Sequence, residues 1–322
     1  MTAAGFSVER ARRALPPFDL DVRAPLRGEL ASYAALYGLD RLAGEVTGGA
    51  DHFLGSVEAF GYQIATQVWL PRRPPRGTLL VLHGYFDHVG LFTHAIRRGL
   101  QRGYAVVAYD LPGHGLSSGN SGDIADFIHY QEVLKDLLAV LKPRLPGPWV
   151  AVGQSTGGAI LLDHITTALA VGRKPAFQRV QLWAPLVRVA RWRQVTLSHT
   201  LLGRVLKQVP RHFRSSSSDP AFIDFLWNRD PFQIKHVPMH WVDSMLRWTQ
   251  TMLARPACRF PVTVVQGDLD ETVDWRFNVD YVQRHTFVEK LVMVAGASHH
   301  LANERDDLRE QVMAALDRYV LT

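Results

Sequence analysis

The sequence predicts an α/β protein built on a mostly parallel, doubly wound sheet. Apolar segments of strand length alternate with segments of helical periodicity, which is typical of this class. The segment 78–83 contains an unbroken apolar run at 79–82, as expected of a strand that is covered on both faces of a parallel sheet. One interval of about 70 residues interrupts the alternation and is far longer than an ordinary connection. A chain of 322 residues is long enough for a sheet domain with such an insertion.

The expected elements follow one another in a regular order. A half-buried hairpin comes first, because residues 62–70 alternate between apolar and polar and residues 52–57 can pair with them across a short turn. The remaining predicted strands are 78–83, 104–110, 149–153, 179–184, 261–266 and 287–295, and the predicted helices of the sheet domain are 126–141, 156–170 and 303–321.

We expect three parts in the chain. Residues 1–50 form an N-terminal extension that carries a helical pattern at 29–39 and packs on the main domain. Residues 51–185 and 256–322 form the sheet domain. Residues 186–255 form an inserted helical cap, because apolar residues such as Val242, Met245 and Met252 recur there at helical spacing. The sequence leaves the task of residues 1–50 and the oligomeric state open.

Composition and charge exclude several classes of function. With 47% hydrophobic and 20% charged residues, the chain has the composition of a soluble globular protein. Its net charge is +6, but no run of five basic residues occurs, so we expect no nucleic-acid partner. A basic face that transiently contacts an anionic membrane is a milder interpretation.

The single cysteine, Cys258, excludes an internal disulfide. Neither a signal peptide nor an apolar run of spanning length is present, which predicts a cytoplasmic protein.

Ser155 lies at the centre of a G-x-S-x-G motif between the predicted strand 149–153 and the predicted helix 156–170. This order of strand, sharp turn and helix is that of a nucleophile elbow. Side chains in place of Gly153 and Gly157 would collide with the adjacent strand and helix, so these glycines permit the turn. The alternative is a glycine-rich turn with an incidental serine. The candidate partners of Ser155 elsewhere in the chain favour the nucleophile.

A serine hydroxyl needs a base to activate it, and the base needs a carboxylate to orient it. The loop after strand 261–266 contains four carboxylates: Asp268, Asp270, Glu271 and Asp274. We assign Asp270 as the acid, because it lies far enough along the loop to point back at an imidazole. Asp268 follows the strand directly and suits a turn, whereas Glu271 and Asp274 are typical of solvent-facing or helix-start positions.

The base is expected in the loop after the last strand, where His299 and His300 are neighbours. We assign His299 as the base and expect His300 to pack or bond locally. The oxyanion of an acyl-transfer reaction needs two backbone N–H donors. Thr156, which follows the serine, supplies the first, and Tyr85 in the loop after strand 78–83 supplies the second, with Phe86 as the alternative. Gly84 lets that loop turn beneath the serine.

These segments resemble a known family. His83 to His88, residues 109–119 and residues 153–158 look like the monoacylglycerol lipase and lysophospholipase branch of the α/β-hydrolases, which also resembles serine aminopeptidases. Residues 267–270 and 296–299 match the acid and base segments of that branch. The resemblance covers roughly residues 50–322 and implies the α/β-hydrolase fold with an inserted helical cap. Thr156 departs from the pattern, because relatives often carry another small or apolar residue there.

The resemblance implies a serine hydrolase that needs no cofactor and no metal. Its small-molecule substrate would be an ester with an acyl chain, of the monoacylglycerol or lysophospholipid type. The acyl chain would lie among Phe86, Trp241, Met245 and Trp248, although a simple packing role for the two tryptophans and Met245 is the alternative. A small-ester carboxylesterase, a thioesterase and a serine aminopeptidase are further possibilities within enzymes. A non-catalytic ligand-binding protein of the same fold is the remaining one.

Overall fold

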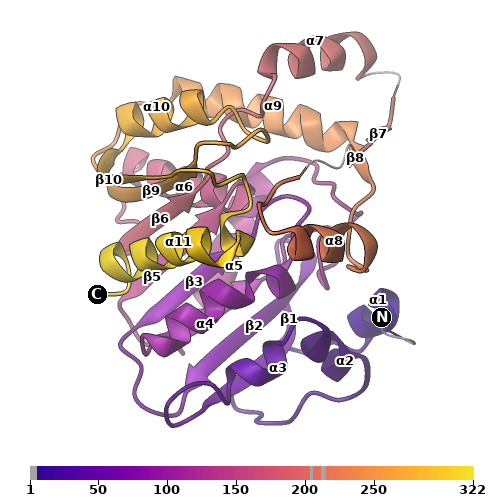
Figure 1. Cartoon of the computed structure of the whole chain (residues 1–322), viewed down its shortest axis with the longest axis vertical. Helices are drawn as coiled ribbons and strands as arrows, with labels where there is room; N and C mark the ends of the chain where they lie inside the picture. The colour runs from indigo at the N-terminus through magenta and orange to yellow at the C-terminus, as the bar shows by residue number, and fades with distance from the viewer. Residues whose placement is uncertain (1–5, 204–205, 212–214) are drawn as a thin grey trace.

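The computed structural model describes residues 6–203, 206–211 and 215–322. Its centre is an eight-stranded sheet (Figure 1). The strands, given in their order across the sheet, are β1 (Ala50–Ala59), β2 (Tyr62–Pro71), β4 (Ala105–Tyr109), β3 (Thr78–Leu82), β5 (Trp149–Gln154), β6 (Arg179–Trp183), β9 (Pro261–Gly267) and β10 (Phe287–Val294). β2 pairs antiparallel with β1 and β4, and all other neighbours are parallel. The predicted hairpin and the mostly parallel sheet are confirmed.

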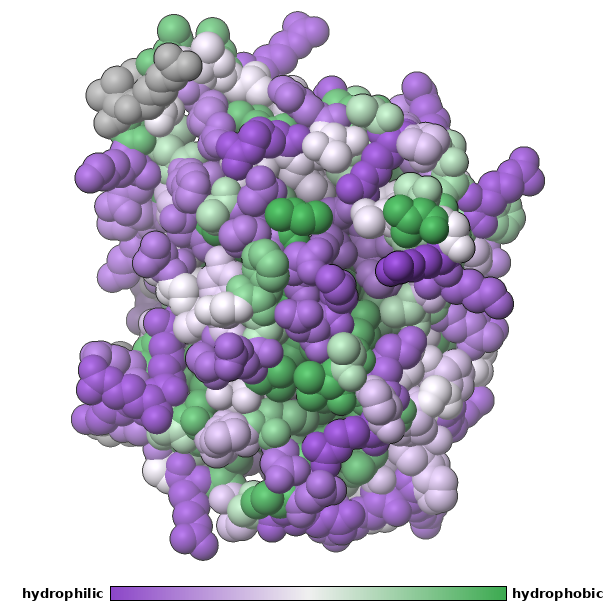
Figure 2. Space-filling model, turned by 180° about the vertical axis from the view of Figure 1, so that it is seen from behind, coloured by the Kyte–Doolittle hydropathy of each residue, from purple (hydrophilic) through white to green (hydrophobic). Residues whose placement is uncertain are grey.

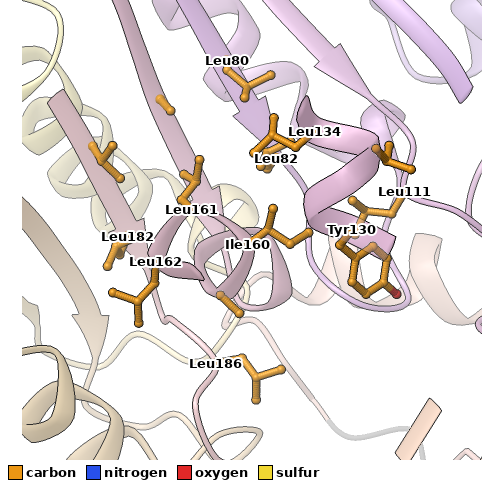
Figure 3. Close-up of a cluster of buried hydrophobic side chains, with 14 of the residues drawn as sticks. Leu80, Leu82, Leu111, Tyr130, Leu134, Ile160, Leu161, Leu162, Leu182 and Leu186 are labelled. Carbon is orange, nitrogen blue, oxygen red and sulfur yellow. The ribbon is translucent and has the colours of Figure 1, made fainter. Parts of the chain in front are cut away.

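Helices cover both faces of the sheet, as the unbroken apolar character of β3 predicted. Leu80 and Leu82 of β3 pack toward one face, and Leu79 and Val81 toward the other. Figure 3 shows leucines of the first face, with Ile160, Leu161 and Leu162 on the helix that follows β5; all belong to one core cluster. The helices of the first face are α5 (Ile128–Leu141), α6 (Thr156–Ala170) and α10 (Trp275–His285), and those of the second are α4 (Thr93–Gln101) and α11 (Asp306–Tyr319). By contrast, the molecular surface in Figure 2 intersperses hydrophobic and hydrophilic side chains.

The N-terminal residues pack on the same face as α4 and α11. They form α1 (Val8–Arg13), α2 (Gly28–Leu36) and α3 (Leu39–Leu42), whose apolar residues join the second core cluster. The helix predicted at 29–39 is shorter than expected. It ends at Leu36 because Gly38 adopts a left-handed conformation with φ of 68° and starts a separate helical turn.

A long segment separates β6 from β9, although these two strands are neighbours in the sheet. We call residues 184–260 the insert. It contains α7 (Trp192–Leu202), β7 (Gln208–Pro210), α8 (Pro220–Asn228), β8 (His236–Pro238) and α9 (Met239–Ala254). β7 and β8 pair antiparallel as a separate two-stranded sheet that the sequence did not predict, because three-residue strands carry too few positions for a periodic pattern.

A buried carboxylate attaches the end of the insert to the sheet domain. Asp163 of α6 is almost completely buried and accepts a hydrogen bond from Trp248 Nε1 of α9 at 2.9 Å. The guanidinium of Arg255, directly after α9, forms an ion pair with the same carboxylate. A buried carboxylate is costly unless it is paired and hydrogen-bonded. These contacts therefore fix α9 along α6, and α6 is the helix that begins after Ser155.

Candidate active site

Ser155 lies in the turn between β5 and α6 with a strained backbone. Its φ of 53° and ψ of −113° are rarely adopted by any residue other than glycine. A Cβ atom on Gly157 would lie 2.5 Å from the carbonyl oxygen of Leu82, and one on Gly153 would lie 2.4 Å from that of Gly157. The collisions predicted for side chains at these two positions are thus present. The close approach of α6 to β3 and β5 places Ser155 where the helix begins.

His299 and Asp270 meet beside the carboxyl ends of β9 and β10. His299 Nδ1 lies 2.7 Å from Asp270 Oδ2, and both side chains are buried. The other carboxylate oxygen of Asp270 accepts hydrogen bonds from the backbone N–H groups of Thr272 at 2.8 Å and Val273 at 3.1 Å. Gln266 Nε2 donates to Oδ2 at 3.1 Å. The carboxylate therefore has a fixed orientation toward the imidazole.

Burial and charge act in opposite directions on this pair. Burial by itself would raise the pKa of Asp270, but the His299 ring and the two backbone N–H groups outweigh it and lower that pKa. Burial would likewise lower the pKa of His299, but the Asp270 carboxylate outweighs it and raises that pKa above its ordinary value. The Asp270 carboxylate is consequently charged, and it stabilises the protonated form of the His299 imidazole.

The other three carboxylates of this loop have local contacts. Asp268 accepts a hydrogen bond from the backbone N–H of Gly296 at 2.7 Å and so joins the two late loops. Asp274 caps α10 by accepting from the N–H of Phe277, as a helix-start residue would. Glu271 is exposed at the edge of the cavity described below. Asp270 is the member of the four that contacts His299.

Ser155 and His299 line one cavity of about 840 Å³. The insert supplies much of its wall through apolar residues of the segment after β6, of β7 and β8, and of α9. Trp241 and Met245 are among them, and Tyr85, Phe86 and Thr156 line the cavity from the sheet domain. Of the four residues that the sequence analysis expected around an acyl chain, Phe86, Trp241 and Met245 line this cavity.

Trp248 is the exception, because it is not among the described residues that line the cavity. Its ring stacks on Phe127 with centroids 4.5 Å apart, and its Nε1 donates to Asp163. Trp241 and Trp248 share a face of α9, but seven residues separate them by about 10 Å along the axis. Trp248 therefore lies beyond the part of α9 that lines the cavity. The pocket assignment of Trp248 is therefore corrected to a packing and hydrogen-bonding role.

We call residues 83–88 the oxyanion loop, after the role that the sequence analysis predicts for it. His83 orients the Gly84–Tyr85 peptide of this loop. Leu111 N–H donates to His83 Nε2 at 2.9 Å, so the ring proton lies on Nδ1, which is 2.7 Å from the carbonyl oxygen of Gly84. Burial lowers the pKa of His83 to about 3, which keeps this ring neutral. Because the Gly84–Tyr85 peptide is trans, its N–H points away from the carbonyl that faces His83.

The loop also passes close to the serine. A Cβ atom on Gly84 would lie 3.2 Å from Ser155 Cβ, so the absence of a side chain there permits the approach. Thr156 is the first residue of α6, and the N–H groups of a first helical turn have no acceptor within their helix. The two backbone N–H groups predicted as oxyanion donors, those of Tyr85 and Thr156, thus belong to segments that flank Ser155.

The sequence analysis missed two charged groups of the cavity wall. Asp87 Oδ1 lies 3.3 Å from His300 Nε2; burial would raise the pKa of Asp87, but the His300 ring lowers it to about 2. Arg211 reaches the cavity from the residue after β7, and burial lowers its pKa to about 10. His300 was expected to bond locally, whereas no local pattern marks Arg211. In the described part of the chain, no cluster of His, Cys, Asp or Glu is arranged to hold a metal ion.

Solved structures share this architecture. A soluble variant of monoglyceride lipase from Saccharomyces cerevisiae, in complex with a substrate analog, superimposes with a TM-score of 0.68 at 18% identity and covers 82% of this chain and 94% of its own. A highly thermostable carboxyl esterase from Bacillus coagulans gives a TM-score of 0.63 at 19% identity, over 82% of this chain and 96% of the esterase. At these identities the likeness is one of fold.

Relatives by sequence are similar over most of the chain or over a shorter part of it. Monoglyceride lipase from Rattus norvegicus is 25% identical over 282 residues, which cover 82% of this chain and 88% of the relative. Monoacylglycerol lipase from Mycolicibacterium smegmatis is 33% identical over 105 residues, and that match covers 32% of this chain and 38% of the relative. The family model described as serine aminopeptidase, S33 (Hydrolase_4) matches residues 73–306, well over half of the chain. The chain therefore belongs to this family of α/β-hydrolases and is monoacylglycerol lipase-like within it.

Proposed function

We propose that this protein cleaves a lipid ester of the monoacylglycerol or lysophospholipid type through a serine acyl-enzyme. The family and the relatives make the chain an ester hydrolase. The observation that carries the finer proposal is the shared cavity of Ser155 and His299, with Asp270 on the Nδ1 side of the imidazole. The name of the rat relative, a monoglyceride lipase, supports the same substrate class.

The mechanism follows from the roles of these three side chains. Since Asp270 occupies Nδ1 of His299, Nε2 is the nitrogen that would take the proton of Ser155 as its Oγ attacks the ester carbonyl. Asp270 stabilises the imidazolium that forms. The N–H groups of Tyr85 and Thr156 bind the oxyanion. His299 then protonates the leaving alcohol, and water repeats the sequence on the acyl-enzyme.

The cavity supports an acyl chain as part of the substrate. Its volume of about 840 Å³ lies within the usual range of small-molecule sites. Trp241, Met245 and neighbouring apolar residues of the insert offer surface that a hydrocarbon chain can cover. We propose that residues 186–255, which make up most of the insert, act as a cap, and that residues 51–185 and 256–322 form the hydrolase core. A small-ester carboxylesterase is the second candidate.

Inactivation of the serine tests the mechanism. A fluorophosphonate probe should label Ser155 in the wild-type protein, and mass spectrometry of the adduct should locate the label at that residue. Ser155→Ala should lose the label and lower kcat by about 10⁶-fold, as removal of a catalytic serine does elsewhere. Ser117→Ala, at a buried serine of the 109–119 turn, is the control for labelling. A Ser155→Ala variant with near-normal turnover would exclude the scheme.

The acid limb of the pH profile tests the Asp270–His299 pair. Protonated His299 cannot act as a base, so kcat/KM should fall as the pH drops, with a midpoint above the ordinary histidine pKa of about 6.5. In Asp270→Asn the burial that lowers the pKa of His299 is opposed only by the smaller effect of the Asp87 charge. The midpoint should move below the wild-type value while the rate falls about 10⁴-fold. An unchanged midpoint in Asp270→Asn would contradict the assignment, and Asp268→Asn serves as the matched control.

A panel of p-nitrophenyl esters distinguishes a lipid ester from a small ester. If hydrocarbon is buried against Trp241 and Met245, kcat/KM should rise from four to twelve acyl carbons by about fourfold per buried methylene, since each CH₂ contributes about 0.8 kcal/mol. Met245→Trp should narrow the cavity and reduce the gain for long chains, leaving the four-carbon ester nearly unaffected. A flat or falling profile in the wild-type protein would favour the carboxylesterase.

We also propose transient contact with anionic membranes. Residues 186–255 contain eleven Arg and Lys and four Asp, an excess of seven positive charges, whereas the whole chain has a net charge of +6. Leu197 and Leu201 of α7 expose 62% and 67% of their surface beside these charges. In the described part of the chain, no helix has the length and apolarity that crossing a bilayer requires. Contact would therefore be peripheral.

Vesicle sedimentation measures this contact. The protein should sediment with phosphatidylglycerol vesicles and much less with phosphatidylcholine vesicles, and 1 M salt should release it, because the Debye length then falls to about 3 Å. Replacing both α7 leucines by serine should weaken sedimentation further. Equal binding to the two vesicle types would rule out an electrostatic attraction.

A further inference from the structure

Both aromatic side chains of the oxyanion loop contact the insert. The ring of Tyr85 stacks on that of Trp241 in α9, with centroids 3.7 Å apart and planes inclined by 15°. The guanidinium carbon of Arg211 lies 3.9 Å from the centroid of the Phe86 ring, a cation–π geometry. The Tyr85 and Phe86 rings also contact each other at 4.1 Å. The loop that carries the proposed oxyanion donor is thus held between two side chains of the insert.

The backbone of this loop is in a conformation that needs support. Phe86 has a φ of 71°, in the left-handed region that few residues other than glycine adopt. Such a conformation persists only when its surroundings impose it. Phe86 directly follows Tyr85, so a relaxation at Phe86 turns the Tyr85–Phe86 peptide and shifts the backbone of Tyr85. The Tyr85 N–H belongs to the preceding Gly84–Tyr85 peptide and moves with that backbone.

The two supporting side chains are fixed independently of the loop. Trp241 is 4% exposed, and its Nε1 donates to the hydroxyl of Tyr130 in α5 at 3.2 Å. Arg211 Nη1 donates to Gln233 Oε1 at 2.7 Å and to the carbonyl of Ile234 at 3.3 Å, both within the insert. The loop therefore rests on groups whose positions the insert and α5 determine.

We propose that Trp241 and Arg211 are positioning residues, which hold the oxyanion loop in the conformation that directs the Tyr85 N–H at the developing oxyanion. The inference rests on the proposed serine mechanism and deepens it. The insert then does more than enclose the substrate, because its contacts with Tyr85 and Phe86 complete the oxyanion hole. A displaced insert would leave Phe86 unsupported, and the serine and its base would remain in place without one of the two donors.

The test replaces Trp241 and compares it with a tryptophan of the same helix. Trp241→Leu should lower kcat for p-nitrophenyl butyrate by about 10- to 100-fold, a partial loss relative to removal of an oxyanion donor, with KM changed less than about threefold. Trp241→Phe keeps an aromatic surface for Tyr85 and should recover most of the loss. Trp248→Leu removes an equally buried ring that stacks on Phe127 instead, and the ion pair of Arg255 with Asp163 still holds the end of α9 to α6. Its kcat should therefore stay within about threefold of wild type.

A second variant and a second measurement separate positioning from a general loss of structure. Arg211→Met keeps much of the apolar stem and removes the cation over Phe86, so kcat should fall with little change in KM or in the melting temperature. Affinity for an alkyl boronic acid, which mimics the tetrahedral intermediate, should fall in proportion to kcat/KM in both variants. Variants whose KM rises at constant kcat, or whose boronate affinity is unchanged, would overturn the inference.

The outcome is distinguishable from a failure of the serine mechanism. If the fluorophosphonate does not label Ser155 in the wild-type protein, the proposed function fails, and the inference fails with it. If wild-type Ser155 is labelled but Trp241→Leu behaves as Trp248→Leu does, the proposed function stands and the positioning role is wrong. Circular dichroism and thermal melting of each variant establish that the compared proteins are folded.

Discussion

The close approach of three backbone segments around Ser155 is the constraint on which the rest of the site depends. The start of α6 meets the end of β3 at Gly157, where a Cβ atom would lie 2.5 Å from the Leu82 oxygen, and the oxyanion loop meets the serine at Gly84. The contact at Gly157 leaves no room for a side chain, and at Gly84 a Cβ atom would lie only 3.2 Å from Ser155 Cβ. Because these three segments approach so closely, the hydroxyl of Ser155, the N-terminus of α6 and a peptide of the oxyanion loop lie close together. This arrangement does not depend on the substrate.

The parallel order of β9 and β10 supplies the second half of the site. The loops that follow two adjacent parallel strands leave the sheet at the same edge, so Asp270 and His299 meet although 29 residues separate them. Burial strengthens their attraction because little water screens it. Burial would be unfavourable for either charged group alone. The hydrogen bonds from Thr272, Val273 and Gln266 offset that cost for the Asp270 carboxylate.

Buried polar contacts join the insert to α6, to the oxyanion loop and to the N-terminal residues. Asp163 holds its C-terminal end to α6, next to the serine turn. Asp230, after α8, accepts a hydrogen bond from the Tyr37 hydroxyl at 2.7 Å and lies 3.3 Å from His88 Nε2. These last two contacts link the N-terminal residues, the oxyanion loop and the insert. The N-terminal helices thereby brace the segment that encloses the cavity, a contribution that their sequence gives no means of predicting.

The sequence by itself determined the sheet, the serine turn and the residue types around it. Strand 78–83 was predictable because burial on both faces requires an unbroken apolar run, and Asp270 was separable from Asp268 by its distance from the strand end. Only the tertiary structure decided which insert residues reach the cavity. Trp241 and Trp248 have the same local pattern, yet one stacks on Tyr85 and the other on Phe127. The sequence around Arg211 is that of an ordinary surface arginine, but in the folded chain its guanidinium lies over the Phe86 ring. Contacts between segments far apart in the chain leave no periodicity in either segment, and the packing of the folded chain alone specifies them.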